Sequence, residues 1–256
     1  CGFAISPVSA LRMSCFQSLS KPDLYGPKEI SVEQLLPAIE VATSDDPQFA
    51  VIWMHGLGAD GSDFEPVVPE LGLAGEPGVR FIFPHAPSIP VTCNGGYVMP
   101  AWYDIITLES TSRRVDESGI VMSREAIRRL IERENQRGIP CARIFLAGFS
   151  QGGAVAYTTA LTHPEKLAGL IALSTYIPIP RLLSDEAAAV NKKIPVFCAH
   201  GMEDEVVSPQ LGIAGRDFLI QHGYPVEWYE YPMPHSVCLE EVKDIGRWLQ
   251  ARMAEC

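Results

Sequence analysis

A serine stands between two glycines in the Gly-Phe-Ser-Gln-Gly motif at residues 148–152, and its surroundings favour nucleophilic chemistry. Residues 142–147 before it form an apolar run typical of a buried strand, and residues 153–161 after it are small and apolar at helical spacing. A strand that turns sharply into a helix at a serine exposes the hydroxyl and places helix N–H groups where an oxyanion can form. A Cβ at either glycine position would clash in so tight a turn. We therefore predict that Ser150 is a nucleophile.

A serine hydroxyl becomes a good nucleophile only when a base removes its proton, and a carboxylate must orient that base. His235 follows a predicted strand at 225–231 and opens the last predicted helix, where the base belongs in such a fold. We therefore predict that His235 is the base. Three other histidines follow Ser150 in positions that suit a base less well: His163, His200 and His222.

The orienting carboxylate is expected in the loop at 201–205, after the preceding predicted strand. Three acids compete in this loop, and periodicity does not choose between them. Asp204 is the first choice, and Glu203 and Glu205 are expected to be solvated neighbours.

Two backbone N–H groups are expected to bind the oxyanion. One belongs to Gln151, directly after the nucleophile, and the other to Leu57, in the glycine-rich loop at 55–61 that follows a predicted strand. His55 and His85 are expected to be hydrogen-bonding loop residues without a catalytic role.

The elements that must position these groups alternate between strand and helix from about residue 34 onward, which predicts a mostly parallel sheet covered on both faces. The long Pro- and Gly-rich stretch at 84–112 is expected to be a lid or a pocket wall. The predicted strands are 37–42, 49–54, 79–83, 143–147, 168–173, 194–199 and 225–231. The predicted helices are 116–136, 151–162, one between Pro209 and Gly223, and 238–253.

Composition and charge limit the classes of function. The chain has 256 residues, of which 47% are hydrophobic and 20% charged, enough for one large domain at 34–256 after a loosely attached N-terminal tail at 1–33. The net charge is −11 and no dense block of Lys or Arg occurs, which disfavours nucleic acid and anionic membranes as partners. No apolar run is long enough to predict an integral membrane segment.

The seven cysteines are scattered, and none forms a Cys-x-x-Cys pair, so neither a disulfide framework nor a zinc site is predicted. Free thiols indicate a reducing compartment, and a cytoplasmic location is expected. A form that is anchored to a membrane by a lipid on Cys1 is the alternative to this location.

Six motifs, in this order along the chain, resemble the phospholipase/carboxylesterase family of α/β hydrolases, which includes bacterial carboxylesterases and eukaryotic acyl-protein thioesterases. The resemblance spans about 34–256, and the segments 92–97 and 171–176 look closer to the bacterial carboxylesterases. The motifs are His-Gly-Leu-Gly at 55–58, Pro-His-Ala-Pro at 84–87, Pro-Ala-Trp-Tyr-Asp-Ile at 100–105, Gly-Phe-Ser-Gln-Gly-Gly at 148–153, His-Gly at 200–201 with Asp204, and His-Ser at 235–236.

The resemblance implies an α/β-hydrolase fold, a doubly wound and mostly parallel sheet with helices on both faces. Matched position by position, it makes Ser150 the nucleophile, His235 the base and Asp204 the acid, and so selects Asp204 over its neighbours. It likewise implies that Leu57 and Gln151 are the oxyanion donors. Two further residues fall at substrate-pocket positions of the family: Trp102 and Tyr176.

The implied activity is that of a serine carboxylesterase, which hydrolyses short- to medium-chain carboxylic esters of small molecules through an acyl-enzyme. No metal or other cofactor is expected. The first alternative is an acyl-protein thioesterase or lysophospholipase that acts on long acyl chains, and a remote one is a catalytically inactive binding module. The sequence neither predicts nor excludes a homodimer, because a single chain reveals no interface patch.

Overall fold

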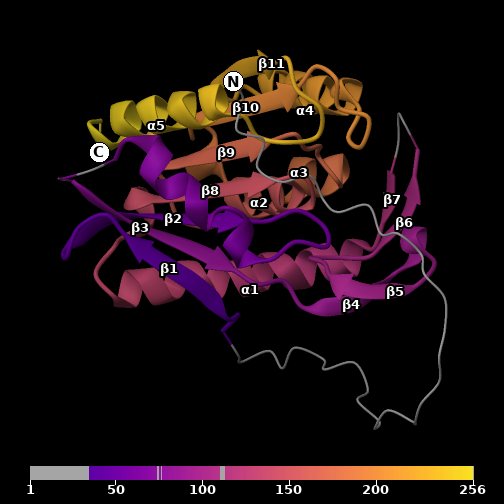
Figure 1. Ribbon diagram of the computed structural model, residues 1–256. Helices are drawn as coiled ribbons and strands as arrows, with labels where there is room; N and C mark the ends of the chain where they lie inside the picture. The colour runs from indigo at the N-terminus through magenta and orange to yellow at the C-terminus, as the bar shows by residue number, and fades with distance from the viewer. Residues whose placement is uncertain (1–34, 74, 76, 110–112, 256) are drawn as a thin grey trace, which may run out of the picture.

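A seven-stranded sheet forms the centre of the molecule, with its strands in the order β1-β3-β2-β8-β9-β10-β11 (Figure 1). Only β1 runs antiparallel to its neighbour β3, and the other neighbouring pairs are parallel, as predicted. The computed structural model describes residues 35–73, 75, 77–109 and 113–255, so the expected tail at 1–33 lies outside the described residues. The strands are β1 (Ala38–Ala42), β2 (Pro47–Met54), β3 (Gly78–Pro84), β8 (Ile144–Phe149), β9 (Gly169–Leu173), β10 (Val196–Gly201) and β11 (Val226–Tyr231).

Helices cover both faces of this sheet (Figure 1). The predicted helix at 116–136 is found within one residue of its expected start, and its N-terminus is capped by the Asp116 carboxylate, which accepts a hydrogen bond from the Ser118 N–H. None of the helices in the described part of the chain is long and apolar enough to cross a membrane. The α-helices are α1 (Glu117–Gln136), α2 (Gln151–Thr162), α3 (Pro180–Glu186), α4 (Pro209–Gln221) and α5 (Leu239–Met253).

The side chains of β2 alternate between two apolar layers, because successive residues of a strand point to opposite faces of the sheet. Ile52 and Met54 pack in one layer with residues of α1 and α2. Val51 and Trp53 pack in the other layer with α5 and the 3-10 helix η2 (Glu65–Leu71). The central strands are therefore buried on both sides, which explains their nearly continuous apolar sequence.

The stretch at 84–112 was predicted as a long loop, and this prediction is wrong in part. It contains strand β4 (Ser88–Val91) paired with β5 (Tyr97–Pro100), and strand β6 (Ile105–Leu108), which pairs with β7 (Arg113–Val115). The four short strands form two antiparallel hairpins at the carboxyl-terminal side of the parallel strands (Figure 1). Of the residues that suggested a loop, Gly95 and Gly96 have positive φ in the β4–β5 turn, and Pro90 lies within β4, which tolerates Pro because both strands of a two-stranded sheet are edges.

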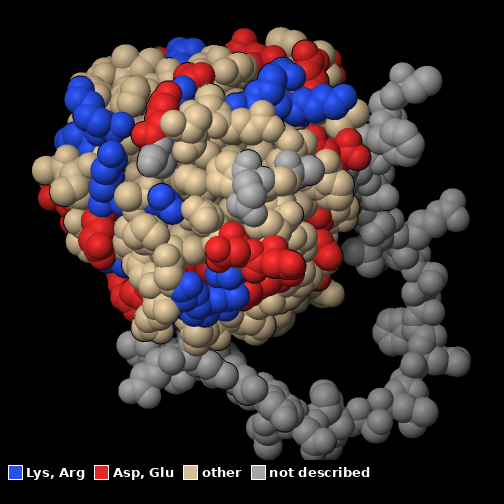
Figure 2. Space-filling model, turned by 90° about the vertical axis from the view of Figure 1, so that its left-hand side faces the viewer, with Lys and Arg blue, Asp and Glu red and all other residues tan. Residues whose placement is uncertain are grey.

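Charged side chains of both signs are interspersed on the end of the molecule where the C-terminus of α5 lies. Figure 2 shows small basic and acidic groups there, divided by uncharged residues. This face of the described residues has no continuous basic surface of the kind that attracts a polyanion.

Glu241, in the first turn of α5, is fully buried. Burial raises the pKa of its carboxyl from 4.5 to about 8, against a smaller opposing effect of the Cys238 N–H. The folded protein therefore keeps this proton up to about pH 8, whereas the unfolded chain loses it near pH 4.5. Because the unfolded state binds fewer protons in that window, stability falls as the pH rises through it.

Replacing Glu241 with Gln should remove this loss of stability. Between pH 5 and 8, the free energy of unfolding of the wild-type protein should fall as the pH rises. We expect this fall to be steeper than that of Glu241→Gln by up to about 1.4 kcal/mol per pH unit. Urea denaturation across that pH range measures the difference. Glu240→Gln, which changes the exposed acid next to it, is the matched control and should keep the wild-type slope. If the free energies of unfolding of wild type and Glu241→Gln changed with pH in parallel, this would contradict the assignment of a buried, neutral carboxyl at Glu241.

Candidate active site

Ser150 lies at the sharp turn between β8 and α2, with backbone angles of φ 55° and ψ −119°. A positive φ is strained for a residue with a side chain, and such strain persists only where the surrounding structure enforces it. Here the Ser150 N–H donates to the Leu173 carbonyl at 2.9 Å, and the Thr175 hydroxyl donates to the Ser150 carbonyl at 2.6 Å. Strand β9 and the loop after it therefore hold the turn in place.

The two glycines that flank the turn are required by close backbone contacts. A Cβ at Gly148 would lie 2.3 Å from the Gly152 carbonyl oxygen, and a Cβ at Gly152 would lie 2.4 Å from the Met54 carbonyl oxygen. Both distances are far below a van der Waals contact. The structure thus agrees with the steric argument made from the sequence, and the backbone of α2 closely approaches β2.

Asp204 and His235 form a direct hydrogen bond, in which His235 Nδ1 lies 2.7 Å from Asp204 Oδ2. The other carboxylate oxygen of Asp204 accepts hydrogen bonds from the Val206 and Val207 N–H groups at 2.9 and 2.7 Å. With Nδ1 donating to the carboxylate, Nε2 of a neutral His235 is left unprotonated. The loop therefore fixes the carboxylate, and the carboxylate fixes the tautomer of the histidine.

Asp204 is 4% exposed, and it remains ionised despite this burial. Burial alone would raise the pKa of its carboxyl, but the imidazoles of His200 and His235 outweigh that effect and hold the pKa well below its usual range. His200 Nε2 lies 3.4 Å from Asp204 Oδ2 and 2.8 Å from the Val207 carbonyl oxygen. This role of His200 could not be predicted from the sequence, because the contact forms only when the loop folds back over the end of β10.

Ser150 and His235 come from distant segments, and Phe149 connects them. The Phe149 ring, which belongs to the residue before Ser150, packs on the His235 imidazole with 4.6 Å between ring centroids. Of the other histidines that follow Ser150, His222 contacts the carbonyl of Phe218 in its own helix, and His163 lies beside the Cys141 thiol. The structure thus brings Asp204, His235 and the turn at Ser150 together and leaves the other two histidines apart.

The loop with the expected second oxyanion donor lies directly beside the nucleophile. A Cβ at Gly56 would stand 3.5 Å from Ser150 Cβ, which places the following Leu57 amide next to the turn. Within the described ranges, neither the Leu57 N–H nor the Gln151 N–H has a hydrogen-bond acceptor, whereas the Gly58 N–H donates to the Pro100 carbonyl at 2.8 Å. Two unengaged amides beside a nucleophile can bind an oxyanion.

The Gln151 side chain has a second role that the sequence analysis did not predict. It is buried, its Oε1 accepts a hydrogen bond from the Trp102 N–H at 2.9 Å, and its Nε2 donates to the Tyr103 carbonyl at 2.7 Å. This side chain therefore fixes the segment before β6 to the nucleophile turn.

Replacing Gln151 with Ala should leave the N–H of Trp102 and the carbonyl of Tyr103 without partners. Each unsatisfied buried group costs about 1–3 kcal/mol, so the free energy of unfolding should fall by about 2–6 kcal/mol. Because the Gln151 amide stays in place, kcat should fall less than after loss of an oxyanion donor. Urea denaturation and steady-state kinetics measure both effects, with Gln221→Ala on the surface of α4 as control. An unchanged stability would contradict the bridging role.

Trp102 and Tyr176, the expected pocket residues, are 2% and 5% exposed. The Trp102 indole N–H donates to the His55 carbonyl at 2.9 Å, and the hydroxyls of Tyr176 and Tyr103 lie 2.8 Å apart. The Arg113 guanidinium stands over the Tyr176 ring, 5.1 Å from its centroid. Both side chains are thus packed around the site, and their contact with substrate stays a prediction.

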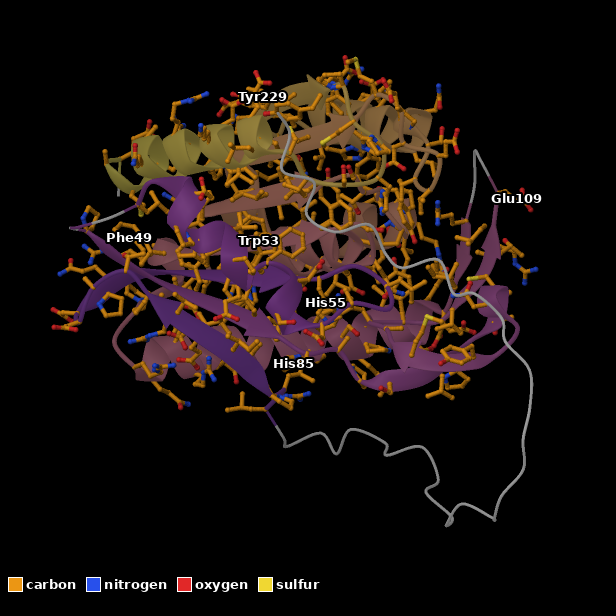
Figure 3. The ribbon with its side chains drawn as sticks, in the orientation of Figure 1. Phe49, Trp53, His55, His85, Glu109 and Tyr229 are labelled. Carbon is orange, nitrogen blue, oxygen red and sulfur yellow. The ribbon has the colours of Figure 1, made fainter. Side chains whose placement is uncertain are left out.

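His55 and His85 lie near the ends of β2 and β3 (Figure 3). His55 Nδ1 lies 2.7 Å from the Gly56 carbonyl oxygen, and its Nε2 accepts a hydrogen bond from the Ala86 N–H at 3.1 Å. Burial lowers the pKa of His55, so the neutral ring that these contacts require is favoured. His85 Nδ1 accepts from the Gly61 N–H at 3.1 Å. Both histidines hold loops together, as predicted.

Residues 37–253 match the family described as Phospholipase/Carboxylesterase. The chain belongs to this family. A relative named acyl-protein thioesterase 1, from Neurospora crassa, is 42% identical over 86% of this chain and 91% of its own length. A probable carboxylesterase from Oryza sativa subsp. japonica is 35% identical over 85% of this chain and 82% of its own length.

Solved structures agree with this assignment. The crystal structure of Arabidopsis thaliana SOBER1 superposes with a TM-score of 0.75 at 31% identity, covering 80% of this chain and 99% of that one. Zea mays acyl-protein thioesterase 2 superposes with a TM-score of 0.74 at 26% identity, covering 85% and 99%. The predicted α/β-hydrolase fold is confirmed, and the chain is a hydrolase that acts on esters.

Proposed function

We propose that this chain is a serine hydrolase that cleaves carboxylic esters through an acyl-enzyme on Ser150. The observation that carries the proposal is the 2.7 Å hydrogen bond between Asp204 and His235, formed beside the strained turn at Ser150. A carboxylate, an imidazole and a serine in this arrangement perform acyl transfer on several unrelated folds. The catalytic domain in this proposal spans 34–256.

In the proposed reaction, Ser150 Oγ attacks the carbonyl carbon while His235 Nε2 takes the hydroxyl proton. The ionised Asp204 stabilises the imidazolium that forms. The N–H groups of Leu57 and Gln151 bind the oxyanion, and His235 then gives the proton to the departing alcohol or thiol. Water, activated by the same histidine, hydrolyses the acyl-enzyme and restores the serine.

Two substrate classes share this chemistry. The first is short- to medium-chain esters of small molecules, as expected from the sequence, with Trp102 and Tyr176 at the pocket. The second is long acyl chains in thioester linkage to proteins, and it is supported by the 42% identity to a relative named acyl-protein thioesterase 1. The two classes differ in the apolar space they need, and not in the catalytic groups.

A chain-length series separates the two classes. We would measure kcat/KM on p-nitrophenyl esters from acetyl to palmitoyl, and on a palmitoyl thioester of a peptide, with Ser150→Ala as control. A maximum at short chains with little thioester cleavage assigns a small-ester carboxylesterase. A rise toward palmitoyl that the thioester matches assigns an acyl-protein thioesterase. No turnover of any of these substrates would overturn the proposal and favour a binding module.

A cytoplasmic location is part of the proposal. Four cysteines in the described ranges are free thiols, which agrees with a reducing compartment: Cys93, Cys141, Cys198 and Cys238. Fractionation of the source cells, with the protein followed by immunoblot, tests the location.

A further inference from the structure

A cysteine, a histidine and a glutamate meet at the end of the molecule opposite the nucleophile. The Cys141 Sγ, a ring nitrogen of His163 and a carboxylate oxygen of Glu165 all lie within 4.8 Å of one another. Cys141 opens the short 3-10 helix η4 (Cys141–Arg143) before β8, and His163 directly follows α2. Because Cys141 precedes β8 and His163 follows α2, the group lies at the amino ends of the parallel strands, whereas Ser150 lies at the carboxyl end of β8.

The spacing of the two buried donors suits a zinc ion. Cys141 Sγ and His163 Nε2 are 3.6 Å apart. In a tetrahedral site, Zn–S of about 2.3 Å and Zn–N of about 2.05 Å place sulfur and nitrogen about 3.6 Å apart. The thiol and the imidazole thus already stand at the separation that a shared zinc ion requires.

The third donor is the Glu165 carboxylate, which follows His163 by two residues and has an oxygen within 4.8 Å of both other donor atoms. Since Glu165 is exposed while Cys141 and His163 are buried, its position gives an ion a route from solvent.

Two asparagines donate hydrogen bonds to the residues that carry the donor atoms. The fully buried Asn191 donates from Nδ2 to the carbonyls of both His163 and Glu165, each at 2.9 Å. Asn135 Nδ2 donates to Cys141 Sγ at 3.0 Å. His163 Nδ1 is buried and has no partner among the described residues, so no hydrogen bond to that atom opposes a small shift of the ring. The Cys141 thiol and the backbone of His163 and Glu165 are thus held in place without the ion, while the His163 ring can adjust to it.

We propose that Cys141, His163 and Glu165 bind a zinc ion at a site separate from the catalytic centre. A thiolate and an imidazole with one carboxylate suit zinc, whereas Mg²⁺ and Ca²⁺ prefer oxygen ligands only. As the Sγ–Zn bond forms, the thiol proton passes to solvent. The ion ties the end of α2 to the start of β8, so its effect is on stability.

Cobalt is the probe that tests the site, because a thiolate bound to Co²⁺ gives a charge-transfer absorption band in the near ultraviolet. The full-length protein, freed of metal by chelation, would be titrated with CoCl₂. We expect a band that saturates at one equivalent and is displaced by one equivalent of Zn²⁺. Carboxylates and the histidine of the catalytic centre can bind cobalt, but they cannot produce this band.

Matched variants show which residues produce the absorption band. Cys141→Ser should abolish it, Glu165→Gln should weaken cobalt binding by about tenfold or more, and Cys238→Ser should leave it unchanged. Glu165 is exposed, so its variant tests the site even if the buried variants fail to fold. Absence of the band, or an unchanged band and affinity in Glu165→Gln, would overturn the proposal.

Thermal unfolding gives a second readout that does not depend on activity. Zn²⁺ at 100 times its Kd should raise the Tm of Ser150→Ala by about 5–10 °C, and at equal zinc concentration should raise that of the same protein carrying Glu165→Gln by no more than about half as much. An equal rise in both proteins would place the ion elsewhere and overturn the proposal.

Discussion

Replacing Asp204 with Asn should lower kcat by about 10⁴-fold, as the equivalent change does in serine proteases. The Asn carbonyl oxygen can still accept from the Val206 and Val207 N–H groups, so the loop should keep its shape. The Asn NH₂ group then faces His235 Nδ1 and can only donate to it. The histidine is forced into the tautomer with Nε2 protonated, which cannot take the proton of Ser150.

Steady-state kinetics on a p-nitrophenyl ester, with circular dichroism to confirm folding, measure the effect. Glu205→Gln is the control from the same loop, because Glu205 is exposed. It should keep activity within about twofold, a surface change of under 0.5 kcal/mol. A severe loss in Glu205→Gln with little loss in Asp204→Asn would show that the wrong acid had been assigned.

Replacing Ser150 with Ala should lower kcat by a factor on the order of 10⁶, the scale seen when a serine hydrolase loses its nucleophile. The substitution keeps the Cβ and the strained turn, and it removes only the hydroxyl. Ser174→Ala is a close control, because Ser174 is the other non-glycine residue with positive φ in the described ranges, at φ 44°. Its hydroxyl is buried without a hydrogen-bond partner there, so its loss should leave kcat within about twofold.

Burst kinetics on the same ester provide a second measurement. Wild-type protein should release one equivalent of p-nitrophenol per active site before the steady rate, if deacylation is the slower step, and Ser150→Ala should show no burst. Activity of Ser150→Ala above a few per cent of wild type would mean that the nucleophile had been misassigned.

The parts of the site that could be predicted from the sequence depend on local geometry. The turn at Ser150 requires glycines at fixed offsets and a strand and helix on either side, and all of these occur within one short segment. The order of strands and helices, which sets where His235 and the loop of Asp204 fall, also follows from the alternation of apolar runs. The resemblance to a family was needed to select Asp204 from its acidic neighbours.

The parts that could not be predicted are contacts between distant segments. Gln151 reaches residues 102 and 103 through its side chain, and nothing in the sequence near either segment signals that pairing. His200 precedes the acid loop in the sequence, yet the loop folds back and brings Asp204 within 3.4 Å of it. The burial of Glu241 was equally hidden, because an acid in the first turn of a helix usually lies at the surface.

The hairpins in 84–112 and the proposed metal site show the same limit. The Pro and Gly residues predicted a loop, although such residues also occur in edge strands and turns. The absence of a Cys-x-x-Cys pair argued against zinc, but Cys141 and His163 are 22 positions apart and meet through the fold. Spacing rules detect sites whose ligands are close in sequence, and they miss sites that the tertiary structure assembles.

Covalent labelling is the most direct test that Ser150 is a nucleophile activated by His235. The full-length protein would be treated with a fluorophosphonate, digested and mapped by mass spectrometry, beside Ser150→Ala and His235→Ala. We predict a single adduct on Ser150, no adduct in Ser150→Ala, and labelling of His235→Ala slower by a factor on the order of 10³ or more. An adduct on another residue, or equally fast labelling without His235, would contradict the account.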